Sequence, residues 1–63
     1  MRGYWQLEFY VEGHHKIRYL YGTDAAVQRR VKRYNPDSKI LIKLDKAKVQ
    51  YLKTEKNARF ITL

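Results

Sequence analysis

Residues 23–36, TDAAVQRRVKRYNP, narrow the range of folds more than any other segment, because they carry signals for both ends of a helix. The side chain of Thr23 or Asp24 can accept hydrogen bonds from the free amides of a first helical turn. Pro36 cannot continue a helix and disfavours helical backbone in the residue before it. The acidic start and basic end of the segment also match the helix dipole. We therefore expect one helix here.

The expected helix has two chemically different sides. At about 100° per residue, Val27, Val31 and Tyr34 fall on one narrow stripe that can pack against a sheet. The rest of the helix surface carries the densest positive charge in the chain. Its cations are Arg29, Arg30, Lys32 and Arg33.

Two strands are expected before this helix. Residues 4–12 alternate in polarity, and residues 16–21 do so less strictly. The odd-numbered apolar residues are Trp5, Leu7, Phe9 and Val11 in the first strand and Ile17, Tyr19 and Tyr21 in the second. Because both odd-numbered sides are the more apolar, we expect them to share the core face. That register requires a three-residue loop, 12–14 or 13–15, and excludes a two-residue loop at 13–14.

The segments after the helix divide into one clear strand and one ambiguous stretch. Residues 39–44 are short, apolar and β-branched, which favours a well-buried strand with Ile40, Ile42 and Leu44 on the core face. Residues 45–56 could form a helix capped by Asp45, since their composition suits a helix. Their charges run against the helix dipole, however. We therefore favour strands at 48–53 and 58–63.

These elements predict a small α+β domain over residues 1–63, in the order ββαβββ, with an antiparallel-rich sheet and one helix packed on one face. Sixty-three residues without cysteine exclude disulfide staples. A chain of this size buries only about 60% of the surface of its unfolded form. A homodimer, through an open sheet face or a sheet edge, could bury more.

Fourteen Lys and Arg against six Asp and Glu give a net charge of +8, which points to a polyanionic partner. Nucleic acid is the first expectation, and an acidic protein surface is the second. No apolar run approaches the roughly 20 residues of a membrane-spanning helix, and the first residues lack the apolar stretch of a signal peptide. We therefore expect a cytoplasmic protein without a membrane partner.

Catalytic and metal-binding motifs are missing from the sequence. There is no nucleophile elbow and no glycine-rich phosphate loop before the helix. His14 and His15 are adjacent, so they should point in different directions and make a poor metal site. A general acid–base site could use His14, Glu8 or Glu12, but no further feature of the sequence indicates such a site. We expect no enzyme activity, no cofactor and no metal.

The helix cations are the strongest functional signal. No acidic residue lies among them, and three of the four are arginines, which bind phosphates bidentately. The alternation of the strands predicts a second basic surface on the sheet face opposite the core. Its expected members are Tyr4, Gln6, Glu8, Tyr10, Lys16, Arg18, Leu20, Lys39, Leu41 and Lys43. Tyr10 and Arg18 are the expected base-stacking contacts, with Lys16 and Lys43 contacting phosphates.

The sequence thus predicts a small nucleic-acid-binding protein, with DNA slightly favoured over RNA. The alternative is a non-catalytic interaction module or inhibitor that docks on an acidic protein through the same helix or a sheet edge. The chain lacks the aromatic signatures of the RNA-recognition fold, zinc-finger ligands and the helical content of a helix-turn-helix. In general style it resembles the short regulators with which phages, plasmids and archaea bind DNA or block a host enzyme.

Overall fold

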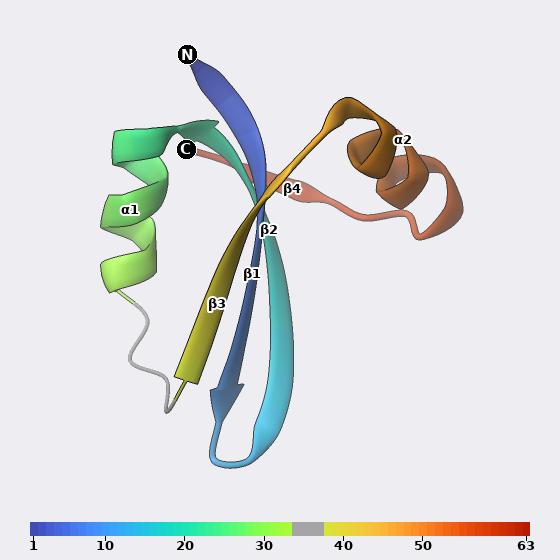
Figure 1. The fold of residues 1–63 in the computed structure, drawn as a ribbon. Coiled ribbons are helices and arrows are strands. Elements are labelled where there is room, and N and C mark those ends of the chain that lie inside the picture. The colour runs from blue at the N-terminus through green and yellow to red at the C-terminus, as the bar shows by residue number, and fades with distance from the viewer. Residues whose placement is uncertain (34–37) are drawn as a thin grey trace.

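The computed structural model describes residues 1–33 and 38–63. Its elements are β1 (Arg2–Val11), β2 (His14–Thr23), α1 (Asp24–Lys32), β3 (Ser38–Leu44), α2 (Lys46–Glu55) and β4 (Phe60–Thr62) (Figure 1). The strands form one sheet in the order β3-β1-β2-β4. β1 runs antiparallel to β2 and β3, whereas β4 is parallel to β2. The predicted α+β class, with an antiparallel-rich sheet and a helix packed on it, is confirmed.

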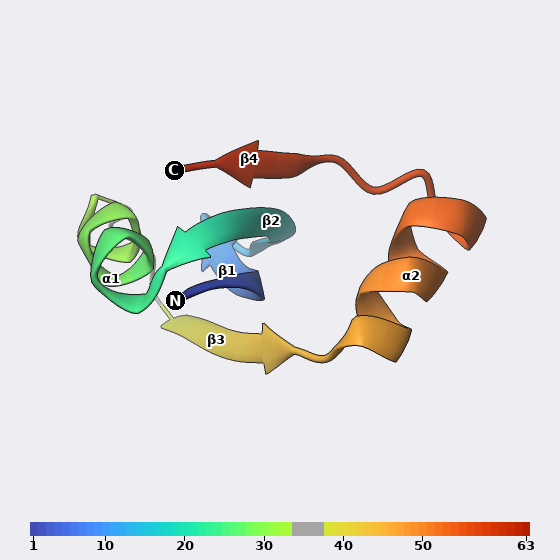
Figure 2. The same cartoon turned by 90° about the horizontal axis from the view of Figure 1, so that it is seen from above.

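The two helices lie on opposite sides of the sheet, as the view from above shows (Figure 2). α1 packs through Val27 and Val31, which are 0% and 6% exposed. We call the covered side, which bears Trp5, Leu7 and Phe9 of β1, the α1 face. The other side bears the even-numbered residues of β1, and α2 stands over one end of it (Figures 1 and 2). We call this side the α2 face.

The β1–β2 hairpin closes with a two-residue loop. Val11 lies opposite His14, so the loop contains only Glu12 and Gly13. Both have positive φ, 51° and 81°, the backbone pattern of a type I′ turn, whose twist matches that of a β-hairpin. The predicted three-residue loop is therefore wrong.

This shorter loop reverses which side of β2 faces the core. Leu20 lies opposite Trp5 and is completely buried on the α1 face. Ile17, Tyr19 and Tyr21 lie on the α2 face, where each is half-buried. The expectation that the odd-numbered sides of both strands coincide is wrong. β2 instead contributes apolar residues to both faces.

β3 is also reversed relative to the prediction. Leu41, which lies opposite Leu7, packs against the core. Ile40 and Ile42, expected in the core, lie on the α2 face and are 58% and 42% exposed; Leu44, on the same side, is half-buried. The strand is apolar on both sides, so its composition cannot indicate which side packs.

The main core lies between α1 and the sheet. Its buried members are Leu7, Phe9, Leu20, Val27 and Val31, and Trp5, Leu41 and Leu63 pack against them. The prediction is confirmed for Trp5, Leu7 and Phe9. Val11, beside the hairpin loop, is 42% exposed instead. Gly22 leaves room where the chain end runs beside β2, because a Cβ atom there would lie 3.0 Å from the Cβ of Leu63.

Residues 46–55 form a helix, α2, and not the strand predicted at 48–53. Asp45 caps it: its Oδ1 accepts a hydrogen bond from the Lys48 amide at 2.8 Å. Val49 and Leu52, the two apolar residues that share a helical side, are its buried residues. Such a cap stabilises a helix by about 1 kcal/mol, whereas each surface charge against the dipole costs a few tenths. The cap and the apolar pair therefore outweigh the reversed charges.

The last strand, predicted at 58–63, is shortened to β4 and pairs with β2, with Phe60 opposite Tyr19. The predicted roles of Tyr34 and Pro36 lie outside the described residues. Among the helices that the structure describes, none is long and apolar enough to cross a membrane.

Candidate nucleic-acid interface

α1 is fixed at its N-terminal end by the predicted cap. The Oγ1 atom of Thr23 accepts a hydrogen bond from the Ala26 amide at 3.2 Å. Asp24 lies in the first turn and the cations lie in the last, so the charges at both ends favour the helix dipole. Because Val27 and Val31 anchor the opposite side, the helix presents its basic side away from the sheet.

Three arginines at the C-terminal end of α1 converge on one hollow. Arg29, Arg30 and Arg33 line it together with Ala26 and Leu63, and its volume is about 370 Å³. The third, Arg33, is the C-cap residue of α1 and is counted with the helix below. Arg30 is half-buried, whereas Arg29 and Arg33 are exposed. Lys32 is also exposed but does not line the hollow. Three guanidinium groups around an open hollow can hold an oxyanion from several sides.

The four cations of α1 are not neutralised by acidic side chains of the described residues, so their charge is available to a ligand. Within residues 1–33 and 38–63, none of them forms an ion pair with an acidic side chain. Asp24, the acidic residue of α1, lies at the opposite end of the helix. Repulsion among unpaired cations is relieved when an anion binds between them.

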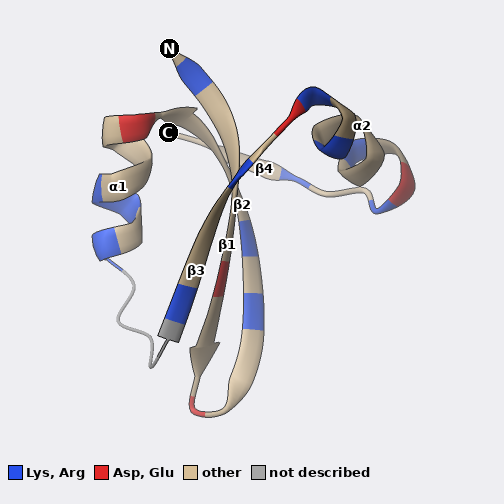
Figure 3. Ribbon diagram, in the orientation of Figure 1, with Lys and Arg blue, Asp and Glu red and all other residues tan. Residues whose placement is uncertain are grey.

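The sheet adds further cations on the same side as α1. Lys16 and Lys39 lie opposite Phe9, Arg18 lies opposite Leu7, and Lys43 lies opposite Trp5. Facing residues project from the same side of a sheet, so all four cations lie on the α1 face. Figure 3 shows these cations on β2 and β3, in addition to those of α1.

The predicted placement of these residues on the face opposite the core is therefore wrong. The physical reason is the two-residue hairpin loop and the register of β3 described above. Two of these cations lie against aromatic rings of the α1 face. The Cζ atom of Arg18 lies 5.7 Å from the ring centroid of Phe9, and the Nζ atom of Lys43 lies 5.6 Å from that of Trp5.

Tyr10 is separated from the other predicted site residues. It lies on the α2 face opposite His15, and the two ring centroids are 5.1 Å apart. Its side chain is 45% exposed. Tyr10 and Arg18 therefore project from opposite sides of the sheet, and they cannot form one stacking surface.

The two histidines point to opposite sides, as predicted from their adjacency. His14 lies opposite Val11 and His15 lies opposite Tyr10, so they project from different faces. Among the described residues, no group of three or more His, Cys, Asp or Glu side chains is arranged to hold a metal ion.

The sequence reasoning missed an aromatic cluster on the α2 face. Tyr4 contacts Tyr21 and Phe60, with ring centroids 4.5 Å and 5.0 Å apart, and Tyr19 contacts Phe60 at 5.3 Å. Lys53 of α2 places its Nζ atom 4.9 Å from the centroid of Tyr4. The signal was the aromatic odd-numbered side of residues 16–21, which the expected register assigned to the main core.

Comparisons with protein-family models, with curated proteins and with solved structures found no match to this chain.

Proposed function

We propose that this chain is a small nucleic-acid-binding protein, with DNA slightly favoured over RNA, that contacts phosphates through α1. The observation that supports the proposal best is the convergence of Arg29, Arg30 and Arg33 on one open hollow with no acidic partner among the described residues. Arginine pairs with phosphate oxygens through two parallel hydrogen bonds, and in DNA complexes such contacts set affinity and register.

The position of four cations on the sheet supports an extended polyanion over a single small anion. Lys16, Arg18, Lys39 and Lys43 lie on the same side of the molecule as α1. A nucleic-acid backbone presents a regular series of charges, so cations from several elements can each contact one phosphate. The net charge of +8 adds a long-range attraction to such a partner.

The proposal assigns different roles to the predicted site residues. Arg29, Arg30, Lys32 and Arg33 contact phosphates from α1, and Lys16, Arg18 and Lys43 extend the same basic surface over the sheet. Arg18 is already oriented, because its Nη1 atom donates a hydrogen bond to the Ile17 carbonyl oxygen at 2.9 Å. Tyr10 takes no part in this surface, because it lies on the α2 face.

The experiment that tests the proposal is binding of a generic duplex and a generic single strand at two salt concentrations. Phosphate contacts predict tight binding at low salt and a steep, linear fall of log K with log salt concentration, with little dependence on base sequence. If neither nucleic acid binds at low salt, the proposal is wrong.

One structural observation favours the second candidate, a protein-interaction module that docks on an acidic protein. β3 is the last strand of the sheet, so its outer edge is open to pairing with a further strand. Lys39 and Lys43 lie on this strand and would meet an acidic partner. Such a partner should bind selectively and with a shallower salt dependence than duplex DNA.

A further inference from the structure

We propose that the α2 face holds a second ligand site, in which an unpaired nucleotide binds between α2 and the start of β1. A pocket of about 550 Å³ lies there, within the range of volumes typical of small-molecule sites. Its walls come from Tyr4 on β1, Leu44 at the end of β3, and Lys46, Val49, Gln50 and Lys53 on α2. This site lies on the side of the sheet opposite the basic side of α1 (Figure 2).

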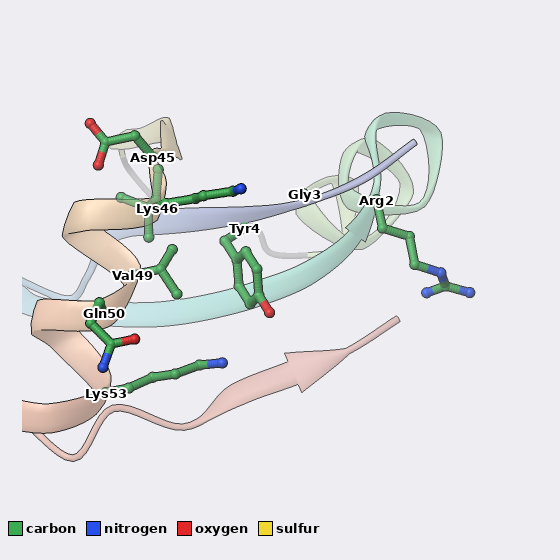
Figure 4. Close-up of a pocket in the computed structure, with 9 residues that line it drawn as sticks. Arg2, Gly3, Tyr4, Asp45, Lys46, Val49, Gln50 and Lys53 are labelled. Atoms are coloured by element: carbon green, nitrogen blue, oxygen red, sulfur yellow. The ribbon is translucent and has the colours of Figure 1, made fainter.

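One wall of the pocket is a fixed aromatic ring. Tyr4 is held by Tyr21, with ring centroids 4.5 Å apart, and by Phe60, which meets it edge-on at 5.0 Å. Val49, only 7% exposed, points toward Tyr4 from α2 (Figure 4). Tyr4 and Val49 are therefore already in place for a flat apolar group, which lowers the entropic cost of binding, and only the flexible Lys53 side chain beside the ring has to shift.

Two lysines of α2 are directed toward the sheet. Lys46 and Lys53 are two helical turns apart, and Figure 4 shows both side chains running along the pocket on either side of Tyr4. The Nζ atom of Lys53 lies 4.9 Å from the ring centroid of Tyr4 and 5.7 Å from that of Phe60. Neither lysine forms an ion pair with a described residue. The pocket thus combines an aromatic wall with two ammonium groups that have no anionic partner there.

The acidic residue at the pocket does not neutralise these lysines. Asp45 lies at the rim, and its Oδ1 atom accepts a hydrogen bond from the Lys48 amide at 2.8 Å as the cap of α2. Its carboxylate points away from Tyr4 (Figure 4). An anion at Lys46 and Lys53 therefore does not face this carboxylate across the pocket.

A ligand that fits must join a flat ring to a negative charge, and a nucleotide has both. The base would lie against Tyr4, Gln50 would offer its amide to the base edge, and the phosphate would lie between Lys46 and Lys53. Bases inside a duplex are stacked and paired, so only an unpaired nucleotide can enter. The inference deepens the proposed function, on which it rests, by adding a single-strand site opposite the phosphate-binding helix.

The test compares lysine variants that each remove one positive charge from α2 or from its C-cap. Lys53→Gln and Lys46→Gln act in the pocket, and Lys56→Gln, at the exposed C-terminal cap, is the matched control. The probes are a fluorescently labelled (dT)8 strand and a blunt duplex, measured by anisotropy at low salt. We expect each pocket variant to weaken (dT)8 binding about threefold more than the control does, as for one lost charge-assisted contact. The affinity for the duplex should change by the same factor in all three variants.

Thymidine 5′-monophosphate and thymidine, titrated into isotopically labelled protein, separate the two sources of a nucleotide. Saturable amide shifts at Tyr4 and Val49 with the monophosphate, and much smaller shifts with thymidine, would assign the pocket to free nucleotides as well as strands. No shift with the monophosphate, together with (dT)8 binding that is sensitive to Lys53→Gln, would assign it to strands alone.

Equal loss of (dT)8 binding in Lys53→Gln, Lys46→Gln and Lys56→Gln, with no monophosphate shifts, would overturn the inference. Intact duplex binding in that experiment would leave the proposed function standing. Failure of the unmodified protein to bind either oligonucleotide would instead overturn the proposed function, and the single-strand site with it.

Discussion

Leu7 lies directly opposite Arg18 in the β1–β2 hairpin, and this pairing places Arg18 on the face that α1 covers. The same rule of facing residues brings Lys16 and Lys43 to that face, beside Phe9 and Trp5. As a result, cations from α1, β2 and β3 lie on one side of the sheet. The aromatic cluster and α2 lie on the other.

Leu20→Ala should unfold the domain, whereas Ile17→Ala should not. Leu20 is 0% exposed, so its truncation should cost about 3–5 kcal/mol, comparable with the whole stability of so small a domain. Ile17 is half-buried on the α2 face, so its truncation should lower the free energy of unfolding by less than half as much. Urea denaturation followed by circular dichroism measures both. The reverse order of stabilities would show that β2 has the opposite register.

Glu12→Asn should stabilise the protein. Glu12 has a φ of 51°, and left-handed backbone costs most side chains roughly 1 kcal/mol, but costs asparagine less. Asn-Gly is also the preferred sequence of a type I′ turn. We expect a gain of about 0.5–1 kcal/mol in the free energy of unfolding, measured by chemical denaturation. A loss of stability would indicate that the loop is longer than two residues.

The register and α2 were mispredicted for one shared reason. With residues 48–53 taken as a strand, the sheet has a single covered face, so the apolar residues of every strand must point to it. In the structure α2 covers part of the second face, and Tyr19 and Tyr21 are partly buried there beside Phe60. Alternation along one strand cannot reveal which of two covered faces a residue joins.

Asp45→Ala should weaken α2 specifically. It removes the acceptor for the Lys48 amide, and the loss of such a cap costs about 1 kcal/mol. We expect lower helical content by circular dichroism and faster amide exchange at Val49 and Leu52, with the exchange of Val27 in α1 unchanged. Unchanged exchange across residues 46–55 would contradict the capped helix.

The candidate interface was predictable in part. The start of α1 at Thr23, its buried valines and its basic side depend on local signals, so the sequence alone indicates them. The grouping of Arg18 and Lys43 with α1 depends on how the strands pair, and a one-residue change of register transfers a side chain to the other face. The pocket at Tyr4 depends on α2 and could not be found without it.

Replacing exposed arginines of α1 should weaken nucleic-acid binding without unfolding the protein. Arg29 and Arg33 are exposed, and such surface changes usually alter stability by less than about 0.5 kcal/mol. Affinity should fall about equally for all base sequences, because phosphate contacts carry no sequence information. Thermal denaturation of Arg29→Ala and Arg33→Ala checks the fold. A large loss of stability in either variant would assign that arginine a structural role instead.

The salt dependence of duplex DNA binding tests the central claim most directly. It should be measured for the unmodified protein, for Arg29→Ala/Arg33→Ala, and for Lys48→Ala/Lys56→Ala, which removes two charges from α2 and its C-cap on the other side of the sheet. The α1 variant should reduce the slope of log K against log salt concentration by about two, roughly one for each lost phosphate contact. The α2 variant should keep the original slope. An α1 variant with unchanged slope and affinity would contradict phosphate binding by this helix.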